Sequence, residues 1–371
     1  MKTYITIITL AIGTISFAQQ SNESMDIGGV NRTYVQYLPT GFNPSTESLP
    51  VVFCLHGLGD VSTNMANIGF NNMADTARFI AIYPQGIANS FGQTSWANGT
   101  SFLSSTADDI TFFNLMINDL ILNKNADPTR IYSSGFSMGG IMSHKLACVL
   151  NDRIAAIGTM SGTMSTDDFT NCVPSYATPV MHVHGTADGT VPYAGSPLPS
   201  LELVEPTIDF WRNVHGCAST ADSTQLPNIA SDGYTVDRFI YQGCSPQGSV
   251  ELWRVNGADH EYFYRPVNDF TEALEIWHFL RKWSHSNPAT ADISSLSKNE
   301  LNIYPNPSNG TFTIVSPEMG KASLISLTGK IIGSIQLQIG ETECNFEGVS
   351  PGVYLIQQEK GQGLSQRIII Q

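Results

Sequence analysis

The sequence predicts an α/β layered fold for residues 31–283, followed by a small β-sandwich. Short apolar runs alternate there with longer segments of helical periodicity, which is typical of a layered α/β sheet. The central apolar runs are continuous rather than alternating, as expected for strands that are covered on both faces. After Trp283 the pattern changes to short strands separated by Gly, Asn and Pro turns. Strands are expected at 33–38, 51–56, 79–84, 130–134, 155–160, 180–184, 239–242 and 250–255.

The composition is that of a globular protein with an acidic surface. Hydrophobic residues make up 42% of the 371 residues and charged residues only 13%. The net charge of -14 argues against nucleic-acid binding, because a phosphate backbone must be met by Lys and Arg. It also disfavours binding to an anionic membrane surface.

The N-terminus has the features of a signal peptide. Residues 1–18 contain Lys2, an apolar run too short to cross a bilayer, and a small-x-small site that ends at Ala18. No later segment is long and apolar enough to span a membrane. We therefore expect a secreted protein, cleaved after Ala18.

Export makes disulfides possible. Six cysteines allow many full pairings, and sequence alone does not choose among them. We expect Cys217–Cys244 and Cys148–Cys172, with Cys344 unpaired. Cys54 lies in a buried-strand pattern, where it packs as a small apolar residue.

The chain is expected to contain two domains joined by a linker. The α/β domain spans 25–284, a Ser/Asn/Ala-rich linker spans 285–299, and the β-sandwich spans 300–371. The last domain has no histidine, so we do not expect catalysis there. A helix beginning with the capping carboxylates Asp108 and Asp109, and a last helix around 269–283, complete the α/β domain.

The C-terminal domain resembles the sorting domain of the type IX secretion system of Bacteroidetes-type bacteria. The matching segments are "LNIYPNPSNGTFTI", "GK", "GVYLI" and a final apolar strand. Such domains often end in a basic residue, whereas this chain ends in Gln371. The resemblance implies transport across the outer membrane by that machinery, then cleavage or surface attachment. A carbohydrate-binding module is the alternative, but this domain has no Trp to stack on sugars.

The stretch "YSSGFSMGGI" predicts a serine nucleophile at residue 137. A short strand precedes it, a helical pattern follows it, and small residues surround it, as in a nucleophile elbow. The motif alone is weak, because a turn serine between glycines also fits. A serine needs a base and an orienting acid further along the chain.

Asp188 and His260 are the expected acid and base. Asp188 follows a strand in "PVMHVHGTADGTVPY", although an Asx-turn role is the alternative. Of the eight histidines, only His260 lies at a strand end after this acid. Asp259 is adjacent to His260, but we expect it to point the wrong way to orient the base.

An oxyanion hole is expected from two main-chain amides. The first is that of Met138, directly after the nucleophile, and the second is that of Leu58 in "VVFCLHGLGD". His56, in the same loop, is expected to brace it rather than to catalyse.

Residues 31–283 resemble the extracellular esterase family of poly(3-hydroxybutyrate) depolymerases, feruloyl esterases and acetyl xylan esterases. The matches are "LHGLGD", "YPQG", Trp96, "DDITFF", "DPTRIYSSGFSMGG", "HGTADGTVPY", the two "GC" pairs and "VELWRVNGADH". The resemblance implies an α/β-hydrolase fold, a serine carboxylic-ester hydrolase and a Cys217–Cys244 bond. Members often have three glycines before the base, whereas this chain has Asn256 to Asp259 there.

The expected substrate is an ester, polymeric or small, with feruloyl or acetyl groups on plant cell-wall polysaccharide favoured. A polyester of the poly(3-hydroxybutyrate) type is the first alternative, and a serine peptidase is an alternative of another class. Trp96, in a polar loop with Phe91 and Phe102, is a candidate substrate-binding residue or else a core residue. No cofactor or metal is expected, because the chain lacks HExxH and CxxC patterns.

Overall fold

The computed structural model describes residues 19–244, 248–289, 301–316, 319–326, 330–338, 340–346, 348–358 and 365–371. The expected signal peptide and most of the expected linker lie outside these residues. The chain forms two compact units, Met1–Ala291 and Asp292–Gln371.

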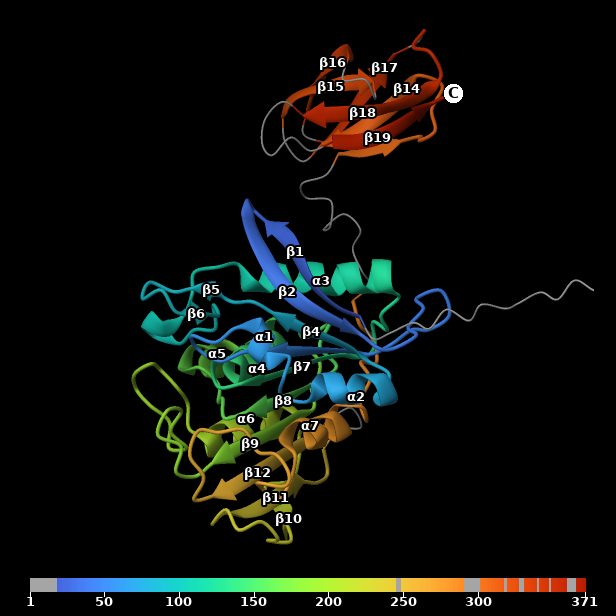
Figure 1. Cartoon of the computed structure of the whole chain (residues 1–371). Coiled ribbons are helices and arrows are strands. Elements are labelled where there is room, and N and C mark those ends of the chain that lie inside the picture. The colour runs from blue at the N-terminus through green and yellow to red at the C-terminus, as the bar shows by residue number, and fades with distance from the viewer. Residues whose placement is uncertain are drawn as a thin grey trace, which may run out of the picture. The chain divides into compact units, whose positions relative to one another are not determined.

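The first unit is built on a ten-stranded mixed sheet (Figure 1). Its strands lie in the order β1-β2-β4-β3-β7-β8-β9-β12-β11-β10. The central strands from β4 to β12 run parallel, whereas β1, β2, β11 and β10 are antiparallel additions at the two edges. The bounds are β1 Gln19–Ile27, β2 Val30–Leu38, β3 Val51–Leu55, β4 Ile80–Pro84, β7 Ile131–Phe136, β8 Ala156–Met160, β9 Val180–Gly185, β10 Ala221–Gln225, β11 Thr235–Tyr241 and β12 Val250–Asn256.

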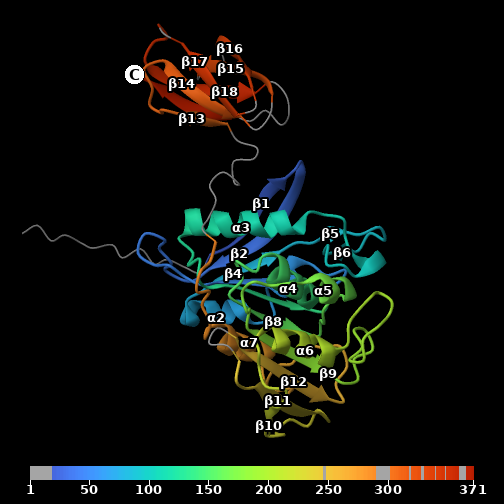
Figure 2. The ribbon, with the colours of Figure 1, turned by 180° about the vertical axis from the view of Figure 1, so that it is seen from behind.

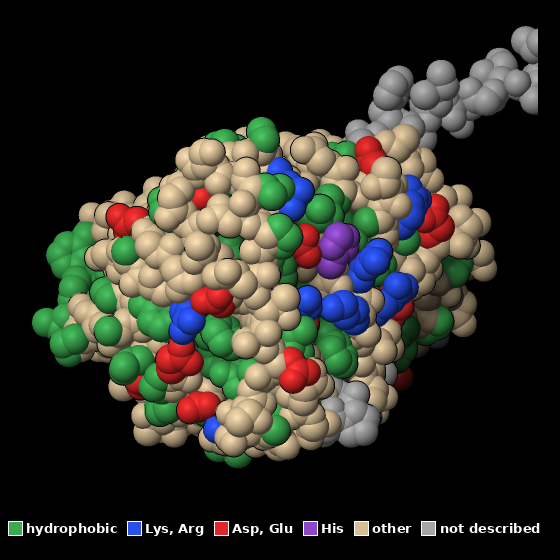
Figure 3. Space-filling model, turned by 90° about the horizontal axis from the view of Figure 1, so that it is seen from below, with side chains coloured by type: hydrophobic (Ala, Val, Ile, Leu, Met, Phe, Trp, Pro, Cys, Tyr) green, Lys and Arg blue, Asp and Glu red, His purple; other side chains and the backbone are tan. Residues whose placement is uncertain are grey.

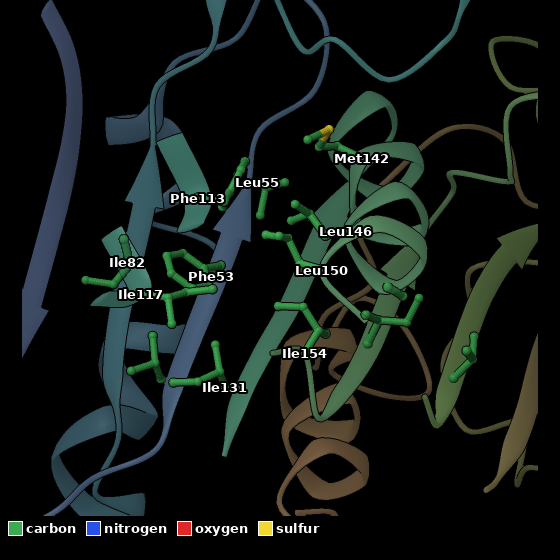
Figure 4. Packing of buried hydrophobic residues seen from close by; sticks show 14 of the residues in the cluster. Phe53, Leu55, Ile82, Phe113, Ile117, Ile131, Met142, Leu146, Leu150 and Ile154 are labelled. Carbon is green, nitrogen blue, oxygen red and sulfur yellow. The ribbon is translucent and has the colours of Figure 1, made fainter. Parts of the chain in front are cut away.

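Helices cover both faces of this sheet, as the two opposite views show (Figures 1 and 2). Alternate residues of β3 enter different cores: Phe53 belongs to the core that includes residues of α3, α4 and α6, and Val52 belongs to the core that includes residues of α2 and α7. Figure 4 shows the first core, where Phe113 of α3 and Leu146 of α4 point toward the strands. The bounds are α1 Ser62–Met65, α2 Phe70–Ala77, α3 Asp109–Lys124, α4 Met138–Val149, α5 Thr166–Asn171, α6 Val204–Val214 and α7 Glu272–Leu280, with β5 Ile87–Ala88, β6 Thr94–Ser95 and η1 Ser101–Leu103 between β4 and α3.

The predicted α/β sheet is therefore present, and all eight expected strands are found with small differences at their ends. β1 and β10 were missed. Their sequences, QQSNESMDI and ADSTQ, are polar edge strands without the continuous apolar pattern of the centre.

The first turn of α3 corrects one expectation. Asp108 caps the helix, since its Oδ1 accepts from the Thr111 amide at 3.0 Å. Asp109 does not cap. Its carboxylate accepts from Arg32 of β2 at 2.6 Å and from the Ala97 amide at 2.7 Å, with both charged side chains almost fully buried. A contact between residues so distant in sequence leaves no local signal.

The second unit packs a three-stranded sheet, β13-β14-β17, against a four-stranded sheet, β16-β15-β18-β19. The predicted β-sandwich is confirmed. Residues from both sheets, such as Ile314 and Ile356, fill its core. The bounds are β13 Asn302–Tyr304, β14 Thr311–Ser316, β15 Gly320–Ser326, β16 Ile331–Leu337, β17 Gly340–Asn345, β18 Gly352–Gln358 and β19 Ser365–Ile370.

The disulfides Cys148–Cys172 and Cys217–Cys244 are present as expected. Cys54 and Cys344 are buried free thiols. Charged side chains are sparse on the face in Figure 3, in keeping with a charged content of 13%. Within the described ranges, no helix has both the length and the apolar content to cross a membrane.

Candidate active site

Ser137 sits on a sharp turn between β7 and α4. Its backbone has φ 56° and ψ -123°, a conformation that non-glycine residues rarely adopt and that is typical of a strained functional turn. The turn is held by the Ser137 amide, which donates to the Met160 carbonyl at 2.8 Å. The strand, turn and helix expected around this serine are therefore present.

The elbow leaves no room for side chains around the serine. A Cβ on Gly139 would overlap the Leu55 carbonyl oxygen, and a Cβ on Gly135 would overlap the main chain of Gly139. A Cβ on Gly162, after β8, would likewise overlap the Ser137 carbonyl oxygen. The main chains of β3, β7 and α4 are therefore in direct contact at the elbow.

Asp188 and His260 meet across the loops after β9 and β12. His260 Nδ1 donates to Asp188 Oδ2 at 2.7 Å. The imidazole also packs against Phe136, the residue before Ser137, with ring centroids 4.6 Å apart and the ring planes tilted by 40°. The parallel strands β7, β9 and β12 all end at the same edge of the sheet, so the three expected residues are brought to one place.

Asp188 also makes the Asx turn that was the alternative interpretation. Its Oδ1 accepts from the amides of Thr190 at 2.8 Å and Val191 at 2.7 Å, which leaves Oδ2 for His260. Asp259 braces the loop instead: its Oδ1 accepts from the amides of His260 and Gly189.

The environment of Asp188 favours the carboxylate form. Burial raises its pKa, but hydrogen bonds from His184 and His260 and the Coulombic interaction with His260 outweigh that effect and hold the pKa well below its ordinary value. An acid that stays ionised can stabilise an imidazolium that forms beside it.

The loop after β3 passes directly beside the serine. A Cβ on Gly57 would lie 3.3 Å from Ser137 Cβ. His56 braces this loop: its Nε2 accepts from the Gly86 amide at 2.9 Å, so its Nδ1 is the donor to the Gly57 carbonyl at 2.7 Å. Leu58 therefore follows a fixed segment next to the serine. Met138 is the first residue of α4, where helix amides lack intrahelical acceptors.

Trp96 is a core residue, which corrects its candidacy for substrate binding. Its side chain is fully buried and its Nε1 donates to the His56 carbonyl at 2.9 Å. The indole thus supports the loop after β3 from behind. Phe91 and Phe102, which share its loop, are exposed and pack edge to face with centroids 5.9 Å apart.

Of two buried histidines that the sequence interpretation set aside, His184 adjoins the acid and His182 lies behind it. His184 Nε2 lies 2.8 Å from the Val191 carbonyl and 3.4 Å from Asp188 Oδ2. His182 lies 3.0 Å behind it and contacts Thr159. The spacing His-x-His on β9 puts both on one face of a strand, a signal that was available in the sequence.

The part of the chain that the structure describes holds no cluster of three or more His, Cys, Asp or Glu side chains that could bind a metal ion. Ser137 lies beside His260, whose imidazole is hydrogen-bonded to the ionised carboxylate of Asp188. This arrangement is suited to nucleophilic catalysis.

Comparisons with known proteins agree with this geometry. Residues 42–203 match the phospholipase/carboxylesterase family profile, and residues 302–371 match the secretion system C-terminal sorting domain. The chain is 26% identical over 76% of its length to a bifunctional acetylxylan esterase/xylanase of Neocallimastix patriciarum, and 28% identical over 62% to feruloyl esterase B of Piromyces equi. It is 29% identical over 39% of its length to a poly(3-hydroxybutyrate) depolymerase of Ralstonia pickettii.

The alignments cover 37%, 42% and 32% of these relatives, so the chain spans less than half the length of each. The expected resemblances to this group of esterases and to the sorting domain are confirmed, as is the α/β-hydrolase fold. The sorting domain marks the chain as a secreted protein.

Proposed function

We propose that this protein, an α/β-hydrolase joined to a secretion sorting domain, hydrolyses carboxylic esters through Ser137, His260 and Asp188. The observation that carries the proposal is the His260–Asp188 hydrogen bond of 2.7 Å beside a serine in a strained elbow. The esterase relatives support the reaction class.

The reaction proceeds in two steps. His260 Nε2 takes the hydroxyl proton as Ser137 Oγ attacks the ester carbonyl, and Asp188 stabilises the imidazolium. The Met138 and Leu58 amides donate to the oxyanion. The intermediate collapses when His260 returns the proton to the leaving alkoxide, which departs as the alcohol. Water, activated by the same imidazole, then releases the acid from the acyl-serine.

We infer that the substrate is an acetyl or feruloyl ester on plant cell-wall polysaccharide. The acetylxylan and feruloyl esterase relatives support this choice, as does secretion, which suits an enzyme that meets a polymer outside the cell. A polyester is the second candidate because of the poly(3-hydroxybutyrate) depolymerase relative. The C-terminal domain is the expected recognition element for type IX machinery.

The test compares the wild type with Ser137→Ala on p-nitrophenyl acetate, methyl ferulate, acetylated xylan, polyhydroxybutyrate film and a chromogenic peptide. Ser143→Ala is the matched control, because Ser143 is buried in α4, the helix that directly follows Ser137, and its hydroxyl donates to the Gly139 carbonyl. We expect the Ser137 variant alone to lose ester cleavage. Activity that survives Ser137→Ala, or cleavage of the peptide only, would refute the proposal.

A further inference from the structure

A chain of hydrogen bonds runs through the core and ends at the acid of the active site. It starts at Thr159 of β8, whose Oγ1 lies 2.6 Å from His182 Nδ1. His182 Nε2 lies 3.0 Å from His184 Nδ1, and His184 Nε2 faces Val191 O at 2.8 Å and Asp188 Oδ2 at 3.4 Å. Thr159, His182 and His184 are fully buried.

The partners decide which ring nitrogens carry protons. His184 Nε2 faces only oxygens that accept, so it must be protonated. In a neutral imidazole the other nitrogen accepts, so His184 Nδ1 accepts a hydrogen bond from His182 Nε2–H. His182 Nδ1 is then an acceptor, and among the described residues the Thr159 hydroxyl is the donor that contacts it. Every bond in the chain points the same way, toward Asp188.

A neutral His184 also fits its surroundings better than a cation would. Its Nε2 lies closer to the neutral Val191 carbonyl than to the Asp188 carboxylate. A second imidazolium beside Asp188 would be fully buried, and it would oppose the positive charge that His260 gains during the reaction.

The other groups that face the chain are uncharged as well. His144 of α4 packs near His182, with ring centroids 5.9 Å apart, and its Nδ1 accepts from Trp211 Nε1. Burial lowers the pKa of His144 to about 3. The phenol ring of Tyr193 meets the His184 ring edge to face. Asp188 is thus the one negative group in contact with the chain among the described residues.

We propose that His184 is a positioning residue for the catalytic acid, with its tautomer set by Thr159 through His182. His184 Nε2 donates to the Val191 carbonyl at 2.8 Å and lies 3.4 Å from Asp188 Oδ2, the oxygen that accepts from His260, so it ties the Asp188 loop back to β9. Asp188 Oδ2 is thereby held in the direction of the His260 Nδ1–H. The proposal rests on the proposed function, since it assigns a role within that triad.

The kinetic test uses His184→Leu, His184→Gln and a control at His215. His215 is a buried imidazole whose Nε2 donates to the Thr178 carbonyl at 2.8 Å, the same bond that His184 makes to Val191, but it forms no ion pair with a carboxylate among the described residues. His184→Leu removes the donor. His184→Gln keeps one, because its amide nitrogen reaches the position of Nε2. His215→Leu removes an equivalent imidazole outside the site.

We expect His184→Leu to lower kcat about tenfold with KM unchanged, because the lost bond acts on the triad and not on substrate. His184→Gln should recover most of that loss, and His215→Leu should lose stability but keep kcat. Equal kcat values for wild type and His184→Leu would overturn the proposal. So would a Gln variant as slow as the Leu variant, or a kcat loss of the same size in His215→Leu.

Nitrogen-15 NMR of histidine-labelled wild type tests the tautomers without any substrate. We expect His182 and His184 to be neutral and protonated at Nε2, and Thr159→Val to disturb this state while Thr159→Ser retains it. A proton on Nδ1 of His184 in the wild type would overturn the tautomer assignment. Thr159→Val also tests the chain if His184→Leu does not fold. Because the spectra are independent of ester cleavage, they distinguish failure of this inference from failure of the esterase proposal.

Discussion

The buried pair of Arg32 and Asp109 gives the sharpest prediction for stability. Replacing Arg32 with Met leaves the Asp109 carboxylate in the core with only the Ala97 amide as a partner. Removing one member of a buried ion pair typically costs about 3–5 kcal/mol. The new side chain still packs on Phe112, over whose ring the Arg32 guanidinium lies at 4.1 Å.

Protonation of Asp109 sets an upper limit to this cost. Burial already raises the pKa of Asp109 from its ordinary value of 3.8, against the opposing effect of Arg32, so the variant carboxyl will be protonated more readily. At pH 7 the cost of protonation is at most about 4.4 kcal/mol, since each pH unit above the unfolded pKa adds roughly 1.36 kcal/mol. At pH 5 the same limit is only about 1.6 kcal/mol.

The sign follows from the direction of the shift. A carboxyl whose folded pKa is raised destabilises the fold increasingly as the pH rises above its unfolded pKa. The penalty of Arg32→Met should therefore be about 3–4 kcal/mol at pH 7 and shrink by more than about 1.5 kcal/mol at pH 5. In the double variant Arg32→Met/Asp109→Asn, the penalty should be smaller and independent of pH.

Urea unfolding followed by tryptophan fluorescence measures these differences. All five tryptophans lie between residues 96 and 283, so the signal reports on the first unit alone. The midpoints should change while the slope stays constant. A penalty that is equal or larger at pH 5, or one that the double variant shares, would refute the reasoning.

Three further predictions concern the active site. Trp96→Phe should keep the fold but lose about 1 kcal/mol of stability and lower kcat, because the His56 carbonyl loses its donor. Thermal unfolding and esterase kinetics measure these two effects. An unchanged kcat would contradict the prediction. Gly139→Ala should yield little folded protein, because the added methyl group would overlap the Leu55 carbonyl oxygen. A variant that is soluble by gel filtration and active in the ester assay would contradict this prediction. Asp188→Asn should reduce kcat by roughly three to four orders of magnitude with intact circular dichroism, and a loss below tenfold would remove Asp188 from the triad.

Local patterns predicted the parts of the molecule that depend on neighbours in sequence. Continuous apolar runs located the central strands, and the glycines around Ser137 predicted the elbow. Chain order and strand ends were enough to single out Asp188 and His260, which the structure places in contact.

The features that were missed depend on contacts between distant residues. Asp109 has the position of a helix cap, but Arg32 draws it into the core. Trp96 lies in a polar loop, yet it is buried under the loop after β3. His182 and His184 were excluded as bases by chain order. Their His-x-His spacing predicts a shared strand face, but only the folded sheet shows that His184 adjoins the acid and that His182 lies behind it.

The close packing of the elbow determines where this protein can be redesigned. At Gly135, Gly139 and Gly162 a single added carbon would meet main-chain atoms, so these positions cannot be used to change selectivity. The segments 88–105 and 189–203 consist largely of loops and have exposed residues such as Phe91 and Leu198. A library for directed evolution should therefore vary the exposed residues of these two segments and leave the elbow, Trp96 and Val191 intact.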